Sequence, residues 1–287
     1  YATIATTNWL PYSWSINNVA FAEVMHTALS YFQAGRADAG YKLLKSSVLD
    51  GMYLGDSPGN FGQISFYDAA RGECYRDFGD PIGVASRVLI QGLFGILPDA
   101  LNKQIILRPG FPADWDKASV STPDISYRFT RKEDTDTYHI TQRFQTPLHP
   151  VLQINARKEK IRSVKVNDVP ATWQSIESAH GYPLLSIQAE GTSSTTITIE
   201  WEGAPLHTLA AQEPVIASNG KLALQIPSGA SISQVYDPQS VLAKHTMGAT
   251  AFNAQIKGEP GHHTFFVYTH QGEMDWWQPV NIYIENT

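Results

Sequence analysis

The stretch ILRPGFP, residues 106–112, divides the chain into two parts with different hydrophobic periods. Before this stretch, apolar residues recur every three to four positions, which is the spacing of one face of a helix. After it, apolar and polar residues alternate, which is the pattern of a strand with one buried face. The sequence therefore predicts a helical part followed by a β-rich part.

Three helices are expected in the first part. The first covers residues 16–32, and the second covers 37–48 and is stopped by Gly51. The third begins at Asp80-Pro81 and ends near Gly95, because aspartate is a good N-cap and proline is tolerated in the first turn. The loop between the second and third helices is about thirty residues long and rich in aromatic residues, and loops of that length are usually functional or disordered. Its aromatic content argues against disorder, so we expect a structured site loop.

The second part consists of short alternating runs separated by turn dipeptides such as Asn-Asp, Ser-Gly and Pro-Gly. This arrangement is typical of β-sandwich domains. A further boundary is expected at 202–205, which gives a helical domain over 1–116, a β-sandwich over 117–203 and a second, Ig-like sandwich over 204–287. The alternating runs are Ile125/Tyr127/Phe129, Tyr138/Ile140, Ile197/Ile199/Trp201, Leu222/Leu224/Ile226, Phe252/Ala254/Ile256 and Val280/Ile282/Ile284.

Composition excludes several classes of protein. The 287 residues include 21 Lys+Arg and 27 Asp+Glu, a net charge of −6, whereas nucleic-acid binding requires a basic stripe. A single cysteine, Cys74, excludes an intrachain disulfide framework and a cysteine-based structural zinc site. No run of 18 apolar residues occurs, so no membrane span is expected. Because the chain begins with Tyr1, we expect that a leader has been removed or that the chain is part of a longer protein.

The densest group of charged residues lies at 71–80, RGECYRDFGD, with three carboxylates and two guanidinium groups. Glycoside hydrolysis needs two carboxyl groups, one as proton donor and one as base or nucleophile. Arg71 and Arg76 are suited to hold a carboxylate ionised or to bind sugar hydroxyls. The alternative is a loop pinned by ion pairs, with Asp80 acting only as an N-cap.

Aromatic residues supply candidate sugar-stacking positions. Trp9, Trp14 and Tyr67 are candidates near the helical part, although such residues more often fill a core. In the β-rich part, DWWQ at 275–278 is either a stacking platform or ordinary sandwich core. We expect one of its two tryptophans in the core and leave the other open.

Other reactive residue types give weaker signals. His262-His263 is poor support for a metal site, because neighbouring strand residues point to opposite faces. Cys74 as a nucleophile is a minor option, and Glu23 with His26 on one helix face favours an interior hydrogen bond. The sequence has no glycine-rich phosphate loop and no His-Glu-x-x-His motif. We therefore expect neither a cofactor nor a metal.

Three segments resemble a known family: AEVMH…YFQAGR…AGYKLL within 22–44, RGE…QGLFGILP within 71–98, and ILRPGFPADW at 106–115. The first is similar to the late hairpins of six-hairpin, (α/α)6-barrel glycosidases, a superfamily that includes α-L-rhamnosidases and maltose phosphorylases. The second resembles their last loop and closing helix, and the third their exit into a C-terminal β-sandwich. The likeness is greatest to an uncharacterised gut-bacterial group of polysaccharide-utilisation proteins.

This resemblance implies a multidomain α+β fold in which the terminal hairpins of an (α/α)6 toroid precede antiparallel β-sandwich modules. It implies that Glu73 is the general base, with Asp77 and Asp80 as substitutes, and that the proton donor belongs to an earlier part of the barrel. The partners would be a carbohydrate and either the missing N-terminal part or a second chain, in the periplasm or at the cell surface. The expected sugar-binding residues are Trp9, Trp14, Tyr67, Arg71 and Arg76.

Two functional hypotheses result. The first is the C-terminal portion of a glycoside hydrolase, inactive by itself because it lacks the proton donor. The second is a non-catalytic carbohydrate-binding or scaffold protein whose aromatic residues dock glycans.

Overall fold

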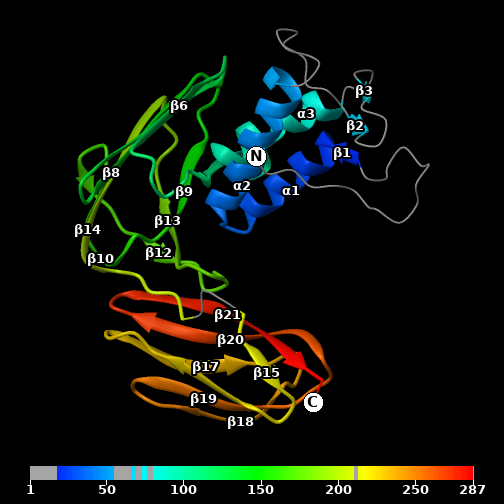
Figure 1. Cartoon of the computed structure of the whole chain (residues 1–287). Helices are drawn as coiled ribbons and strands as arrows, with labels where there is room; N and C mark the ends of the chain where they lie inside the picture. The colour runs from blue at the N-terminus through cyan, green and yellow to red at the C-terminus, as the bar shows by residue number, and fades with distance from the viewer. Residues whose placement is uncertain (1–17, 55–65, 69–72, 76–79, 210–212, 287) are drawn as a thin grey trace. The chain divides into compact units, whose positions relative to one another are not determined.

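The structure is a computed structural model, and it describes residues 18–54, 66–68, 73–75, 80–209 and 213–286 (Figure 1). The chain forms two compact units. Unit 1 comprises residues 1–129, 141–152 and 190–193, and unit 2 comprises 130–140, 153–189 and 194–287.

The helical segments lie in unit 1. They are α1 (Phe21–Gln33), α2 (Ala37–Val48) and α3 (Asp80–Arg87), with π-helical turns η1 (Leu49–Leu54) and η2 (Val88–Leu93) and a 3-10 turn η3 (Ala100–Asn102). α1 begins at Phe21, later than predicted, because Asn18–Ala20 form strand β1 and pair with β2 (Phe66–Asp68). β2 pairs in turn with β3 (Glu73–Tyr75).

Phe32 anchors α1 to the rest of the helical part. Its ring is buried against three glycines, where an added Cβ would lie 3.0 Å (Gly40), 2.7 Å (Gly92) and 2.3 Å (Gly110) from ring atoms. These glycines belong to α2, to η2 and to the stretch that follows the helical part. Because glycine has no side chain, the aromatic ring packs directly on the backbone at all three positions.

The strands between residues 96 and 205 form two sheets. One has the order β11-β10-β14-β8-β7-β6 and the other β12-β13-β9-β5-β4, in which β5 and β9 are parallel. The first sheet contains β6 (Lys117–Ser121), β7 (Ile125–Lys132), β8 (Thr135–Gln142), β10 (Lys158–Val166), β11 (Val169–Pro170) and β14 (Ser194–Pro205). The second contains β4 (Ile96–Asp99), β5 (Gln104–Leu107), β9 (His149–Asn155), β12 (Gln174–Ser175) and β13 (Leu184–Gln188).

The strands after residue 213 form a two-layered sandwich, the C-terminal sandwich, within unit 2 (Figure 1). One sheet has the order β15-β21-β20-β17 and the other β16-β19-β18. The first contains β15 (Val215–Ala217), β17 (Ala230–Tyr236), β20 (Gly261–Gln271) and β21 (Met274–Glu285). The second contains β16 (Lys221–Gln225), β18 (Leu242–Met247) and β19 (Ala251–Ile256). Inward residues of both sheets, Phe252, Phe265 and Ile282 among them, share one buried apolar core.

The alternating runs correctly predicted which side chains face inward. Every apolar residue named in those runs, from Ile125 to Ile284, is buried. The β-sandwich prediction is therefore confirmed, since burying every second side chain is what a two-layer arrangement requires.

The expected toroid of helical hairpins is wrong. The described residues contain three short α-helices, of 13, 12 and 8 residues, and strands predominate in the rest. The 3.6-residue period correctly indicated local helices. It carried no information on how many further helices would surround them, because that depends on contacts between distant residues.

Candidate functional site

The sequence-predicted site residues are described only in part. Glu73 lies in β3, where its backbone pairs with Asp68, and Tyr67 lies in β2, where it pairs with Cys74. Asp80 is the first residue of α3. Trp9, Trp14, Arg71, Arg76 and Asp77 lie outside the described residues. Whether these side chains act together stays a prediction.

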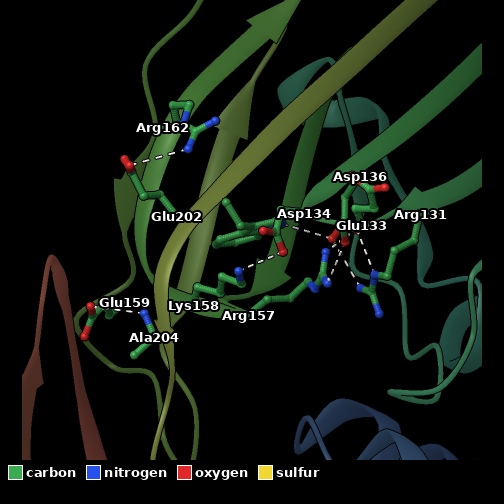
Figure 2. Close-up of polar contacts among 11 residues, drawn as sticks. Arg131, Glu133, Asp134, Asp136, Arg157, Lys158, Glu159, Arg162, Glu202 and Ala204 are labelled. Carbon is green, nitrogen blue, oxygen red and sulfur yellow. Dashed lines mark hydrogen bonds and ion pairs between the residues drawn. The ribbon is translucent and has the colours of Figure 1, made fainter.

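A buried charged network surrounds Asp136 on β8 (Figure 2). Asp136 is 1% exposed, and its carboxylate accepts hydrogen bonds from Arg131 Nε at 2.8 Å and Nη2 at 3.2 Å. It also accepts from Arg157 Nη1 at 2.9 Å and from the indole Nε1 of Trp201 at 3.1 Å. The Arg157 Nη2–H donates to the carbonyl oxygen of Glu133 at 3.1 Å. β7, β14 and the residue before β10 are thereby joined to one carboxylate on β8.

This network is built for stability and not for chemistry on a ligand. Four donors occupy the lone pairs of the Asp136 carboxylate, which leaves no acceptor position for a substrate proton. Two positive groups and one indole N–H satisfy the buried charge, as a charge removed from water requires. Burial, together with the negative charge of Asp136, raises the pKa of the nearby Tyr138 hydroxyl far above its usual value. Tyr138 is therefore neutral at physiological pH.

The C-terminal sandwich has aromatic residues on the outer side of one sheet. In β20, Phe265 and Val267 are fully buried, whereas Phe266 and Tyr268 are partly exposed. In β21, Trp276 is 1% exposed and Trp277 is partly exposed. The sequence left one tryptophan of this pair open, and the structure places it on the outer side.

The exposed rings come together across three strands. Strand register sets Tyr236 opposite Phe266 and Tyr268 opposite Trp277. The Tyr268 and Trp277 ring centroids lie 5.0 Å apart at 54°, and those of Tyr236 and Phe266 lie 6.1 Å apart at 29°. The His180 ring packs edge-on to Phe266 at 5.7 Å. We call Tyr236, Phe266, Tyr268, Trp277 and His180 the aromatic face.

A short loop fixes the position of His180 within unit 2. The Gly181 N–H donates to the Trp277 carbonyl at 2.8 Å, and the Trp277 N–H donates to the Ala179 carbonyl at 3.1 Å. Through these two bonds, His180 forms an isolated parallel β-bridge with Trp277 of β21. The backbone of Trp277 is therefore held on both sides, by this loop and by β20.

Polar groups border the aromatic face. His270 Nδ1 lies 2.8 Å from Asp275 Oδ1, and the exposed Gln234 is opposite Tyr268 in the register. Burial and then the charges of Asp275 and Glu177 raise the pKa of the Tyr268 hydroxyl. Asp275 lies on the same side of β21 as Trp277, so its carboxylate is at the border of the aromatic face.

The other sheet of the same sandwich has no comparable rings on its outer side. The exposed positions of β16 are Lys221, Ala223 and Gln225, and those of β19 are Asn253 and Gln255. Such a polar outer side is the usual result of alternation in an antiparallel sheet. The aromatic face departs from this pattern, because four aromatic rings lie at outward positions of its strands.

In the described part of the chain, we find no metal-binding group and no membrane-spanning helix. Its His, Cys, Asp and Glu side chains form no group of three that could hold a metal ion. Among the helices that the structure describes, none has the length and apolarity of a membrane-spanning segment.

Comparisons with known proteins place the chain in no family. No family model matches, and no curated protein matches. Tandem Ig repeats of Dlar align with 54% of this chain and 91% of theirs, at 10% identity and a TM-score of 0.20. The N-terminal periplasmic domain of ScsB from Proteus mirabilis aligns over 58% and 98%, at 8% identity and 0.18. SGBP-B of the Bacteroides ovatus mixed-linkage glucan utilization locus, solved with a mixed-linkage heptasaccharide, aligns over 59% and 63%, at 8% identity and 0.21.

These values are too low to support a conclusion about function. In the described residues, strands predominate and the α-helices are three short ones. The resemblance to six-hairpin glycosidases is therefore corrected: the short motifs at 22–44, 71–98 and 106–115 do not extend to a shared fold.

Proposed function

We propose that the chain is a non-catalytic carbohydrate-binding protein and that its aromatic face holds the glycan. The observation that supports this proposal is the grouping of Trp277, Tyr268, Phe266 and Tyr236 on the outer side of a sheet whose inner side already fills a complete core. Because the core does not need these rings, they are available for contact with a ligand.

The chemistry of the face suits sugars. A pyranose ring has an apolar C–H side that packs on a flat aromatic ring, and hydroxyl groups around its edge that need hydrogen-bond partners. Trp277 and Tyr268 supply neighbouring rings, and Gln234, His270 and Asp275 supply polar groups at their border. Tyrosine and tryptophan are enriched in binding sites because they combine apolar area with a polar end.

A periplasmic or cell-surface location is part of the proposal, since polysaccharides are encountered there. The domain boundaries after residues 116 and 203 are also proposed. The roles expected for Glu73, Asp77, Asp80, Arg71, Arg76, Trp9, Trp14 and Tyr67 stay predictions, which single substitutions in the assay below would check.

The test is glycan binding by the full chain and its variants. A glycan array and affinity gel electrophoresis with soluble polysaccharides identify ligands, and calorimetry with oligosaccharides gives the affinity. We expect Trp277→Ala and Tyr268→Ala each to weaken binding at least about tenfold, equivalent to about 1.4 kcal/mol. Trp277→Phe keeps a ring and should retain part of the affinity.

Two control variants separate loss of the face from general damage. Tyr53→Ala removes an exposed tyrosine from η1, and Lys221→Ala alters the opposite sheet of the same sandwich. Both should bind like the parent chain. Binding of no glycan by the parent chain, or unchanged affinity in folded Trp277→Ala, would overturn the proposal.

A further inference from the structure

Charge is unevenly distributed between the two sheets of the C-terminal sandwich. Strands β15, β17, β20 and β21 contain no lysine and no arginine. Residues 213–286 contain three lysines and no arginine, and the lysines lie in β16 (Lys221), in β18 (Lys244) and directly after β19 (Lys257). All fixed positive charge of the sandwich is therefore associated with the sheet opposite the aromatic face.

The ionisable groups beside the aromatic face are carboxylates and histidines. Asp275 shares the outer side of β21 with Trp277, and the exposed Glu177 lies three residues before His180, whose ring contacts Phe266. At the other end of the sheet, Glu213 lies 2.9 Å from His262.

The pKa of the Tyr268 hydroxyl agrees with this arrangement of charges. Its pKa is raised first by burial and then by the charges of Asp275 and Glu177. Both carboxylates thus oppose the appearance of a negative charge at the position of the phenol. A ligand carboxylate or sulfate stacked on the same ring would meet the same repulsion, with no guanidinium or ammonium group on the sheet to offset it.

We infer that the aromatic face selects glycans by charge: it accepts uncharged glycans and amino sugars and rejects glycans that carry uronate or sulfate groups. This inference rests on the proposed carbohydrate binding. The inference adds a class of ligand to that proposal, since aromatic stacking alone does not distinguish a neutral sugar from a uronic acid. Protonated amino sugars gain from the same carboxylates and from cation–π contact with Trp277 and Tyr268.

The experiment is a glycan array in which neutral, amino-bearing, uronate-bearing and sulfated glycans are all represented, probed with the full chain. We expect ligands among the neutral and amino-bearing glycans and none among the acidic ones. Acidic glycans that bind as well as neutral ones would overturn this inference and leave the proposed function standing. An array without any ligand would overturn the proposed function and the inference with it.

A pair of substitutions tests the source of the selectivity. The double variant Glu177→Gln/Asp275→Asn should raise the ratio of acidic-glycan to neutral-glycan affinity about tenfold or more and should lower the ratio of amino-glycan to neutral-glycan affinity. The matched control is Glu285→Gln, which removes a carboxylate from the outer side of the same strand, about 33 Å from Asp275 at about 3.3 Å per residue. Because that distance exceeds the Debye length several times, the control should leave the ranking of glycans unchanged. An unchanged ranking in the double variant would show that these carboxylates do not set the selectivity.

Discussion

The network around Asp136 and the aromatic face are both made of carboxylates beside aromatic rings. They differ in how many of these groups have their hydrogen-bond partners within the protein. In the network, one buried carboxylate is bound by Arg131, Arg157 and Trp201. On the aromatic face, Trp277 and Tyr268 are partly exposed, and the nearby Asp275 side chain is 40% exposed and contacts His270.

The difference separates a structural role from a binding role. A group whose partners all belong to the protein contributes to folding and has nothing left for a ligand. Rings that the core does not need can contribute to binding at small cost to folding. Stability and glycan affinity should therefore respond to different substitutions in these two regions.

The largest stability effect should come from Asp136→Asn. The change removes the charge that compensates Arg131 and Arg157, so we expect a loss of about 3 kcal/mol in the free energy of unfolding. Denaturant unfolding followed by tryptophan fluorescence measures it. Asp134→Asn, in the β7–β8 turn, breaks an ion pair between the exposed Asp134 and Lys158 and should leave the unfolding midpoint unchanged. Equal behaviour of the two variants would contradict the structural role given to Asp136.

Trp201→Phe should have a smaller effect in the same network. It removes the indole N–H donor to Asp136 while both arginines remain, and the phenyl ring fills most of the space. We expect a loss of about 1–2 kcal/mol, measured from the denaturation midpoint. A loss as large as that of Asp136→Asn would show that packing, and not the hydrogen bond, dominates at this position.

Alkaline pH should destabilise the parent chain through Tyr138. The folded state keeps the proton of this buried hydroxyl to a higher pH than the unfolded chain, whose tyrosines ionise near pH 10. The unfolded state therefore binds fewer protons above about pH 10, and stability falls as pH rises, by up to about 1.4 kcal/mol per pH unit. At pH 8, Tyr138→Phe should be less stable than the parent. Between pH 10 and pH 11, its free energy of unfolding should fall by about 1 kcal/mol less than that of the parent. Parallel pH curves for the two proteins would refute this assignment.

The smallest stability effect should come from the aromatic face. Tyr268→Phe keeps the ring and removes a partly exposed hydroxyl, so the free energy of unfolding should change by less than about 0.5 kcal/mol. Glycan affinity should be retained more fully than in Tyr268→Ala. A loss of stability comparable to that of Trp201→Phe would place this residue with the structural network instead of the binding face.

The sequence contained some of the signals for both regions. Asp136 occupies the same side of its strand as Tyr138 and Ile140, so the alternation by itself indicates an inward-facing carboxylate. Phe266 and Tyr268 stand in the opposite phase to Phe265 and Val267, which marks them as outward-facing. Neither signal identified the partners, because Arg157 and Trp201 lie 21 and 65 residues from Asp136.

By itself, the sequence determined which side chains of each strand face inward and where short helices form, because both depend on a local period of two or 3.6 residues. Only the tertiary structure decided what those elements pack against. The helices were expected to belong to a ring of hairpins, yet Phe32 packs on glycines of the following segments. The aromatic face likewise depends on the register of β17, β20 and β21 and on a loop carrying His180, more than eighty residues before Phe266. Contacts over such separations arise from strand pairing across the fold, which no local pattern encodes.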